Sequence, residues 1–421
     1  MIAVQSAAWL KFHPLTMNCF PYTGTALALL SLICCTCSGA ALTNALNESK
    51  NSWLAQGRFH TEAEAKAKLS EFAKTYSDRA GWERRAQIIR AGILRGASLE
   101  PLPACTALNP IHRGERRHDG YTVENVAFES RPGFFVTGNL YRPFPRKAGE
   151  KHPAVLVTHG HSADTVSGGR FRAGTQALGA TLARAGAIVF AYDMVGYGEA
   201  TQFKHKSDIT LGLQLWNSIR AVDFIQSLPE VDAARVGITG ESGGATQALL
   251  LAAVEDRITV TVPVVMVSAH FYGGCDCESG MPVHRSPDHE SNNAEIAALA
   301  APRPQLIISD GKDWTKNVPE VELPYIQNVY RLMNAESKVE NLHLANEGHD
   351  YGPSKRAGAY AFLGKHLGLQ LDRIRASDGT FNEQPVTLQQ REALLVFDAS
   401  HPWPEHALGT PDAVEAQFHQ R

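Results

Sequence analysis

The chain has 421 residues, of which 44% are hydrophobic, and its formal net charge is −3. This length suits a large α/β domain with flanking segments, or a few average domains. Because basic and acidic side chains are nearly balanced and interspersed, the composition argues against binding to nucleic acid, to an anionic membrane or to a polyanionic substrate.

The N-terminus has the pattern of a secretory signal peptide. Lys11 precedes an apolar stretch over residues 25–35, and the small residues Ser38 and Ala40 suit cleavage after position 40. The apolar stretch is too short to span a bilayer comfortably. We therefore expect residues 1–40 to be removed and the mature protein to be secreted or periplasmic, with an uncleaved anchor as the alternative.

Three cysteines remain after cleavage at this position: Cys105, Cys275 and Cys277. At most one disulfide forms among them, and a bridge between cysteines one residue apart closes a strained ring. The sequence therefore favours a disulfide from Cys105 to one of the other two. Three histidines lie near the paired cysteines: His270, His284 and His289. Their spacing matches no standard structural zinc site, so we expect no metal.

Helical spacing of apolar residues over residues 51–99, for example Leu69, Phe72 and Tyr76, predicts two or three helices. We assign residues 41–118 to an N-terminal helical segment. Two strands are predicted next, at residues 121–128 and 134–141. They form a hairpin at the edge of a sheet.

Beyond residue 153, apolar runs alternate with helical patterns, which indicates a parallel sheet with right-handed crossovers. The predicted strands are residues 154–158, 187–191, 235–239, 260–265 and 305–309. The helices expected between and after them include residues 176–184, 214–228 and 321–335. The fold class is therefore α/β, with a mostly parallel central sheet flanked by helices over residues 119–370. Residues 371–421 form a C-terminal extension with one possible strand at 393–397.

The segment Gly240–Gly244, GESGG, follows a predicted strand directly and precedes the helix-forming residues 245–253. This is the nucleophile-elbow pattern, in which a sharp strand-to-helix turn holds a serine in a strained conformation between small residues. Ser242 is the predicted nucleophile, and Gly240 and Gly244 are the small residues of the elbow. A tight glycine turn without chemistry is the alternative.

A serine nucleophile requires a general base and a carboxylate that orients it. His349 is the predicted base, in preference to His343, which lies inside a predicted strand. Two aspartates, Asp310 and Asp313, follow the strand that ends at residue 309, and either is eligible as the acid. We prefer Asp313, because it lies farther into the loop, from which it can reach the histidine.

Ester cleavage also creates an oxyanion, which backbone N–H groups must stabilise. Gly243, directly after the nucleophile, is one expected donor, and His161, in the loop after the strand 154–158, is the other. The alternative is that His159 and His161 are ordinary polar loop residues. Three aromatic residues are candidates for a sugar-binding pocket, although core packing is their commoner role: Trp216, Tyr272 and Trp314.

Residues 158–161 (THGH), the GESGG segment, Asp313 and residues 347–349 (EGH) together resemble the α/β-hydrolase superfamily. The hairpin that leads into residues 140–143 (LYRP) is similar to that of the acetyl xylan esterase and dienelactone hydrolase-like branch. The resemblance covers about residues 120 to 370. It implies a triad and an oxyanion hole made of the residues already selected: Ser242, His349, Asp313, Gly243 and His161.

Two features depart from the pattern of this branch. Gly311 lies two residues before Asp313, where three is the commoner spacing, and this keeps Asp310 open as the acid. The segment 272–297 has no counterpart in the general pattern. We expect it to cover the site and to carry substrate specificity.

The resemblance implies a secreted serine esterase that removes acyl groups, acetyl in the first instance, from carbohydrates through an acyl-enzyme. The expected partner is a carbohydrate or small ester, without nucleic acid, membrane or cofactor. A prolyl-oligopeptidase-type peptidase is one alternative, but such enzymes usually carry a large propeller that the short helical segment before residue 119 cannot form. A catalytically silent binding protein with the same fold is the other.

Overall fold

The computed structural model describes residues 57–58, 60–279 and 281–420. The predicted signal peptide, residues 1–40, lies outside this part of the chain. Among the helices described, none has both the length and the apolar character that crossing a bilayer requires.

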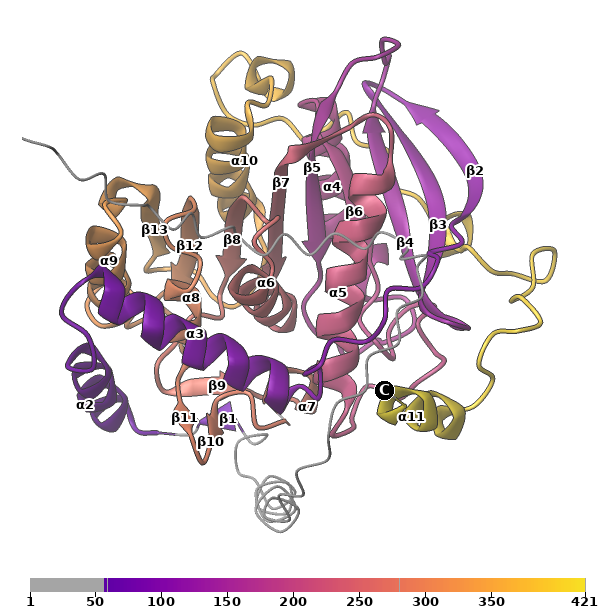
Figure 1. Ribbon diagram of the computed structural model, residues 1–421. Helices are drawn as coiled ribbons and strands as arrows, with labels where there is room; N and C mark the ends of the chain where they lie inside the picture. Colours follow the sequence, from indigo (N-terminus) through magenta and orange to yellow (C-terminus); the bar gives the residue numbers. More distant parts are fainter. Residues whose placement is uncertain (1–56, 59, 280, 421) are drawn as a thin grey trace, which may run out of the picture. The chain divides into compact units, whose positions relative to one another are not determined.

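A nine-stranded sheet in the order β13-β12-β8-β7-β5-β6-β4-β3-β2 forms the centre of the fold (Figure 1). The mutually parallel strands are β5 (His152–Thr158), β6 (Ile188–Tyr192), β7 (Val231–Glu241), β8 (Val260–Val264), β12 (Gln305–Asp310) and β13 (Val339–Leu344). Most of their residues are buried, because helices cover both faces, and this explains why the strands read as apolar runs. The predicted α/β class with a mostly parallel sheet is confirmed.

The antiparallel end of the sheet consists of β2 (Ile111–His118), β3 (Tyr121–Arg131) and β4 (Phe134–Pro143). Strands β3 and β4 form the predicted hairpin, but not at the edge of the sheet, because β2 pairs outside β3 and β4 pairs with β6. Strand β2 lies within the segment predicted to be helical, so the sheet begins at Ile111 rather than after residue 118. Its sequence, IHRGERRH, has no apolar alternation because it is a half-exposed edge strand.

Helices cover the two faces of the sheet with different sets. On one face lie α4 (Ala173–Arg184) and α10 (Pro353–Leu367); on the other lie α5 (Thr210–Ser227) and α6 (Gly243–Val254), with α8 (Asn293–Ala298) and α9 (Glu322–Leu332) beside them (Figure 1). Apart from Thr246 and Gln247, helix α6 consists of glycine and apolar residues, and it is buried from Gly243 to Ala253. It is therefore a core helix, enclosed between the sheet and an outer layer.

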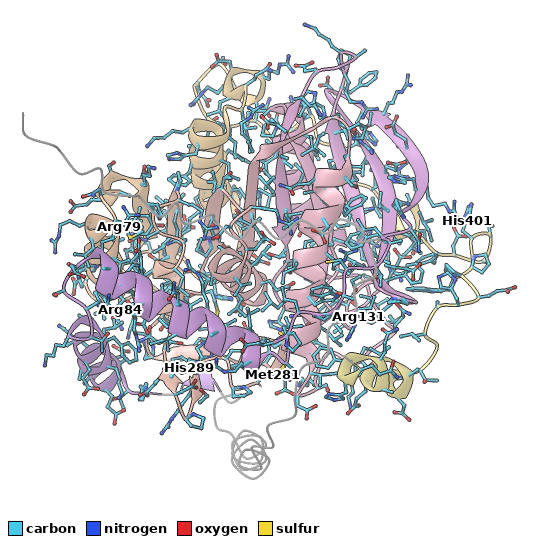
Figure 2. The ribbon with its side chains drawn as sticks, in the orientation of Figure 1. Arg79, Arg84, Arg131, Met281, His289 and His401 are labelled. Atoms are coloured by element: carbon cyan, nitrogen blue, oxygen red, sulfur yellow. The ribbon has the colours of Figure 1, made fainter. Side chains whose placement is uncertain are left out.

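The outer layer contains the predicted N-terminal helices, α2 (Glu62–Ala73) and α3 (Arg79–Gly96). Helix α3 packs on α6 and α9, and Arg85 forms an ion pair with the fully buried Glu295 at 2.8 Å. The absence of a side chain at Gly92 is required, because a Cβ atom there would lie 2.4 Å from the His289 ring. Figure 2 shows His289 and Met281 beneath this helix.

Segment 272–297 contains short elements between β8 and α8. They are β9 (Phe271–Gly273), which pairs with β1 (Gly57–Arg58), then α7 (Asp276–Ser279), and the paired strands β10 (Arg285–Ser286) and β11 (His289–Glu290). Helix α3 contacts both β10 and β11. The N-terminal helices therefore support this segment from outside.

The C-terminal extension carries helix α11 (Pro411–His419) and no strand at 393–397. A 3₁₀ turn, Arg391–Leu394, occupies the start of that stretch. The backbone around it bonds to buried side chains instead of a sheet edge: the Leu394 carbonyl accepts from Arg170, and the N–H groups of Val396 and Phe397 donate to Glu199. These side-chain partners satisfy the backbone groups that a strand would have paired.

Candidate active site

Ser242 lies at the turn from β7 into α6 with φ 53° and ψ −124°, a conformation that non-glycine residues rarely adopt. Its N–H group donates to the Val264 carbonyl at 2.9 Å. The turn fits only without neighbouring side chains, because a Cβ atom at Gly240 or Gly244 would lie 2.1 Å and 2.4 Å, respectively, from atoms of Thr158. The strand, strained turn and helix that the elbow pattern requires are therefore all present.

The structure brings the two other predicted triad residues together. His349 Nδ1 lies 2.7 Å from Asp313 Oδ2, and the second carboxylate oxygen of Asp313 accepts from the N–H and hydroxyl groups of Thr315, both at 2.6 Å. The Asp313 side chain is 3% exposed and that of His349 is 33% exposed. A buried, fully bonded carboxylate thus holds an imidazole that reaches solvent. The structure forms no hydrogen bond between His349 and Ser242, a contact that is often long before substrate binds.

Asp310, the other eligible acid, has a different environment. It is fully buried, accepts from the Lys312 N–H group at 3.0 Å and lies 3.3 Å from Lys355 Nζ. Burial raises the pKa of Asp310, and the nearby charge of Asp313 adds to this. His343, in strand β13, bonds to the Ser309 hydroxyl at 2.9 Å. Asp310 and His343 therefore anchor the sheet edge, and the candidate acid and base are Asp313 and His349.

Two residues that the sequence reasoning missed hold the histidine loop. Lys355, at the start of α10, is fully buried and donates to the Gly348 carbonyl and to Asp350 Oδ1. Burial lowers the pKa of Lys355, but the hydrogen bond to Asp350 and the charge of Asp310 raise it by more. The net shift is upward, so the Lys355 ammonium group stays charged. The Tyr351 hydroxyl lies 2.7 Å from Thr239 Oγ1, which ties the histidine loop to the nucleophile strand. A lysine two residues after the helix-initiating Pro353 is the available signal.

A cavity of about 250 Å³ lies beside these groups, and His161, Arg172, Glu241 and His349 are among the residues that line it. Arg172 pairs with Glu241, the residue before the nucleophile. The sequence reasoning missed this pair, because its members are far apart in the chain. It places a cation and an anion at the wall of a cleft next to the elbow, where both can meet polar groups of a ligand.

The three aromatic candidates divide into core and site residues. Trp216 and Tyr272 are 1% and 2% exposed, so they belong to the interior. Trp314 is partly buried, its ring centroid lies 4.4 Å from that of His349, and it stacks on Phe271 at 4.1 Å. Trp314 therefore supports the ring of the candidate base.

The two residues expected to donate to an oxyanion lie against each other. Gly243 is the first residue of α6, where N–H groups have no partner within the helix. A Cβ atom at Gly243 would lie only 2.5 Å from His161 Cε1, so the His161 ring packs directly on this turn. His159 is an interior residue, 3% exposed, and its Nε2 accepts from the Met194 N–H group at 3.0 Å. Burial lowers its pKa to about 4.

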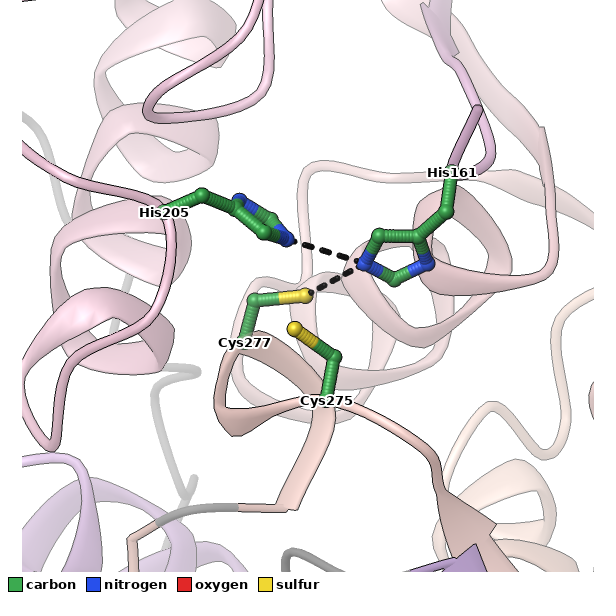
Figure 3. Close-up of side chains that lie close together, drawn as sticks. All are labelled: His161, His205, Cys275 and Cys277. Atoms are coloured by element: carbon green, nitrogen blue, oxygen red, sulfur yellow. Dashed lines mark hydrogen bonds between the residues drawn. The ribbon is translucent and has the colours of Figure 1, made fainter. Parts of the chain in front are cut away.

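The His161 side chain also belongs to a cluster that the sequence did not indicate. His161 Nε2 lies 3.0 Å from His205 Nε2 and 3.1 Å from Cys277 Sγ, with Cys275 beside them (Figure 3). Cys275 and Cys277 are both free thiols, so the expected disulfide from one of them to Cys105 is wrong. Both sulfur atoms face the two histidines instead.

The histidines near the cysteines in sequence have other partners. His284 bonds to Asn293 at 2.8 Å, His289 accepts from or donates to Ser286 at 2.6 Å, and His270 contacts the Ser268 hydroxyl at 3.1 Å. Burial lowers the pKa of His284 to about 4. The bonds of His284 and His289 lie within segment 272–297 and hold it together, whereas His270 bonds just before it, and the partners of all three differ from Cys275 and Cys277.

Comparisons with known proteins agree with this geometry. Residues 214–278 match the family model of acetyl xylan esterase. The solved structure of methylesterase BT1017 is 36% identical with a TM-score of 0.78, and the match covers 86% of this chain and 79% of that one. YtaP of Bacillus subtilis (strain 168), assigned as a hydrolase, is 28% identical over 245 residues, which are 53% of this chain and 78% of YtaP.

A more distant structure shares the fold alone. It is a protein of Bacteroides fragilis NCTC 9343 assigned as an acetyl xylan esterase, 16% identical with a TM-score of 0.50, and the match covers 73% of this chain and 82% of that one. The identity and coverage shared with the methylesterase establish the family, and the sheet order and nucleophile elbow fit it. The chain therefore belongs to the α/β-hydrolase superfamily, in its acetyl xylan esterase-like branch of carbohydrate esterases.

Proposed function

We propose that the protein is a serine esterase that hydrolyses esters carried by carbohydrates, with Ser242 as nucleophile, His349 as general base and Asp313 as the acid that orients it. The observation that carries this proposal is the 2.7 Å hydrogen bond between His349 and the buried Asp313. It lies at the same edge of the sheet as the strained serine turn, since all three residues follow the carboxyl ends of parallel strands.

The proposed reaction has two steps. Ser242 Oγ attacks the ester carbonyl while His349 Nε2 takes its proton, and the proton then passes to the leaving alcohol. His349 Nδ1–H donates to Asp313, which fixes the tautomer that leaves Nε2 free to accept. Water, deprotonated by His349, then hydrolyses the acyl-enzyme. The N–H groups of Gly243 and His161 are the proposed donors to the oxyanion in both steps.

Two ester types are candidates for the substrate. The similarity to a methylesterase extends over 86% of this chain, whereas the acetyl xylan esterase model matches residues 214–278. We therefore infer that a methyl ester of a sugar carboxylate is the first substrate to test. The acetyl ester of a sugar hydroxyl, expected from the sequence, is the second. The two differ in which side of the bond carries the sugar, so the released small molecule distinguishes them.

Export of the protein suits either substrate, because carbohydrate polymers lie outside the cytoplasm. Cleavage after Ala40 would leave Ala41 as the first residue of the mature protein. N-terminal sequencing of the protein from the periplasm or medium tests this, and an intact Met1 on protein recovered from the membrane fraction would contradict it.

The decisive experiment measures both products with the full chain. Methanol release from a methyl-esterified polyuronide and acetate release from acetylated xylan are compared for the wild type, Ser242→Ala and the exposed-site control Ser400→Ala. We expect Ser242→Ala alone to abolish release, and a fluorophosphonate probe to label the wild type and the control but not Ser242→Ala. Release that survives Ser242→Ala, or no labelling of the wild type, would overturn the serine mechanism.

A further inference from the structure

Four side chains with metal-binding atoms converge beside the nucleophile helix: His161, His205, Cys275 and Cys277 (Figure 3). They come from three separate loops, after β5, between β6 and α5, and around α7. One nitrogen or sulfur atom from each lies within 4.8 Å of all the others. The catalytic proposal uses the backbone of His161 but none of these four side-chain atoms.

The donor set and its spacing match a closed zinc site. Two imidazoles and two thiolates are a common tetrahedral ligand set for Zn²⁺, with bond lengths of about 2.0–2.1 Å to nitrogen and 2.3 Å to sulfur. Tetrahedral geometry with those bonds separates the ligand atoms by roughly 3.3 to 3.8 Å. The two Nε2 atoms lie 3.0 Å apart, and His161 Nε2 lies 3.1 Å from Cys277 Sγ, slightly less than this spacing. All four ligand atoms lie within 4.8 Å of one another, slightly more than this spacing. The observed distances therefore bracket those of a tetrahedral site.

The surroundings of the cluster also favour a bound metal. His205 Nδ1 donates to the Val195 carbonyl at 2.7 Å, which leaves the lone pair on Nε2, the atom that faces His161. Cys277 is 1% exposed and packs with Met194 and Tyr197. An outer hydrogen bond that fixes the histidine tautomer is typical of protein metal sites, and the apolar contacts of Cys277 shield one ligand atom from water, while His161, His205 and Cys275 are partly exposed.

We propose that His161, His205, Cys275 and Cys277 bind one Zn²⁺ ion that fastens segment 272–297 and the β5 loop to the first turn of α6. Four protein ligands leave no open position for substrate, so the ion is structural. Its effect on chemistry passes through His161, whose ring packs on Gly243. The ion fixes the loop that carries one of the two proposed oxyanion donors.

The first test measures metal in the full chain, purified without a histidine tag and under reducing conditions. We expect about one zinc per chain in the wild type and in the exposed-site control His401→Asn, and little in Cys277→Ser or His205→Asn. To keep the test independent of whether these variants fold, wild-type protein is also loaded with Co²⁺. The expected spectrum has the visible bands of tetrahedral cobalt and a thiolate-to-cobalt charge-transfer band.

Three results would overturn the metal site. They are wild-type protein without zinc after incubation with Zn²⁺, a cobalt spectrum without the thiolate band, and a disulfide between Cys275 and Cys277 in protein isolated without reductant. None of these measurements depends on esterase activity, so the metal site and the proposed function fail separately.

The link to the oxyanion hole rests on the proposed function and has its own test. Removal of zinc from the wild type by a chelator is expected to lower kcat by up to about 10²–10³-fold, the effect of losing one oxyanion donor, and added Zn²⁺ is expected to restore it. An unchanged kcat in zinc-free protein that keeps its circular dichroism spectrum would overturn this link.

Discussion

The candidate triad and the Cys–His cluster both adjoin the first turn of α6, through Ser242 and through the His161 ring on Gly243, but the chain assembles them differently. Each triad residue lies within five residues of the end of a sheet strand, and Asp313 is held by Thr315, a near neighbour in sequence. The cluster joins segments as far apart as His161 and Cys277, 116 positions away. The sheet therefore places the triad, whereas the cluster depends on every loop that enters it. The buried charges around Arg170 are assembled like the cluster, because they also come from separate segments of the chain.

The largest expected effect breaks the triad, which the sheet places. Asp313→Asn should lower kcat/KM by about 10³–10⁴-fold, because an amide in place of the carboxylate favours the wrong histidine tautomer. Steady-state kinetics on the released product measures this. Asp310→Asn is the matched control, since Asp310 pairs with Lys355 and makes no contact with His349. A larger loss from Asp310→Asn would assign the acid to Asp310.

The next effect concerns a long-range assembly. Arg170 is fully buried and joins Asp193, Glu199 and the Leu394 carbonyl of the C-terminal extension. Arg170→Leu leaves two carboxylates buried without their cation, which should lower the free energy of unfolding by about 3–5 kcal/mol. Chemical denaturation measures it.

The control for this change is an ion pair at the surface. Lys365 pairs with Glu340 at 2.8 Å, and their side chains are 61% and 44% exposed. Lys365→Ala should change stability by less than about 1 kcal/mol. Equal losses of unfolding free energy in the two variants would mean that the Arg170 network contributes no more to stability than a solvated ion pair. The stability of the protein would then not depend on this long-range assembly.

The same contrast explains how much of the fold could be predicted. Parallel strands such as β5 and β12 are buried apolar runs, so a pattern within a few residues identifies them. Strand β2 is charged and lies at the edge of the sheet, so its sequence does not predict a strand. Residues 393–397 are apolar and therefore predict a strand, but their backbone bonds to side chains instead. In both cases partners outside the segment decide the structure.

The site follows the same rule. Ser242, Asp313 and His349 were selected from motifs and chain order, and the structure places Asp313 on His349. The cluster could not be predicted, because its cysteines face His161 and His205 rather than the histidines near them in sequence. Nothing in a local spacing identifies ligands that only the packing of loops brings together.

Gly243 is the point where the two regions meet. A Cβ atom there would lie 2.5 Å from His161 Cε1 and 3.1 Å from Met194 Cε, so Gly243→Ala must displace the His161 ring. We expect kcat to fall by about 10²–10³-fold and the zinc content to fall with it. Alanine is favourable in helices, so the helix itself is not weakened.

Gly409→Ala is the control for this substitution, because no atom lies within 4 Å of the added Cβ. Kinetics and elemental analysis on the same preparations give both readouts. A loss of activity with full zinc content would show that the oxyanion turn and the cluster are independent.

The smallest effect concerns a buried charge without an ion-pair partner. Glu322, at the start of α9, is 1% exposed; one carboxylate oxygen accepts from the Ala269 N–H group at 2.9 Å, and the other has no partner among the described residues. Burial raises the pKa of Glu322 to about 7 from an ordinary value of 4.5. In this respect Glu322 differs from the paired carboxylates around Arg170.

The sign of the pH dependence follows from this shift. Between pH 4.5 and 7 the folded protein keeps the Glu322 proton that the unfolded chain loses, so the contribution of Glu322 to the free energy of unfolding falls by about 3 kcal/mol as pH rises. Glu322→Gln keeps an acceptor for Ala269 and cannot ionise, so it should stabilise the protein at pH 8 and have little effect at pH 4.5. Denaturation at both pH values measures this, with the exposed Glu336→Gln as control. If the stability difference between Glu322→Gln and wild type is the same at both pH values, Glu322 is ionised throughout this range. A local partner must then compensate its charge, as Thr315 does for Asp313.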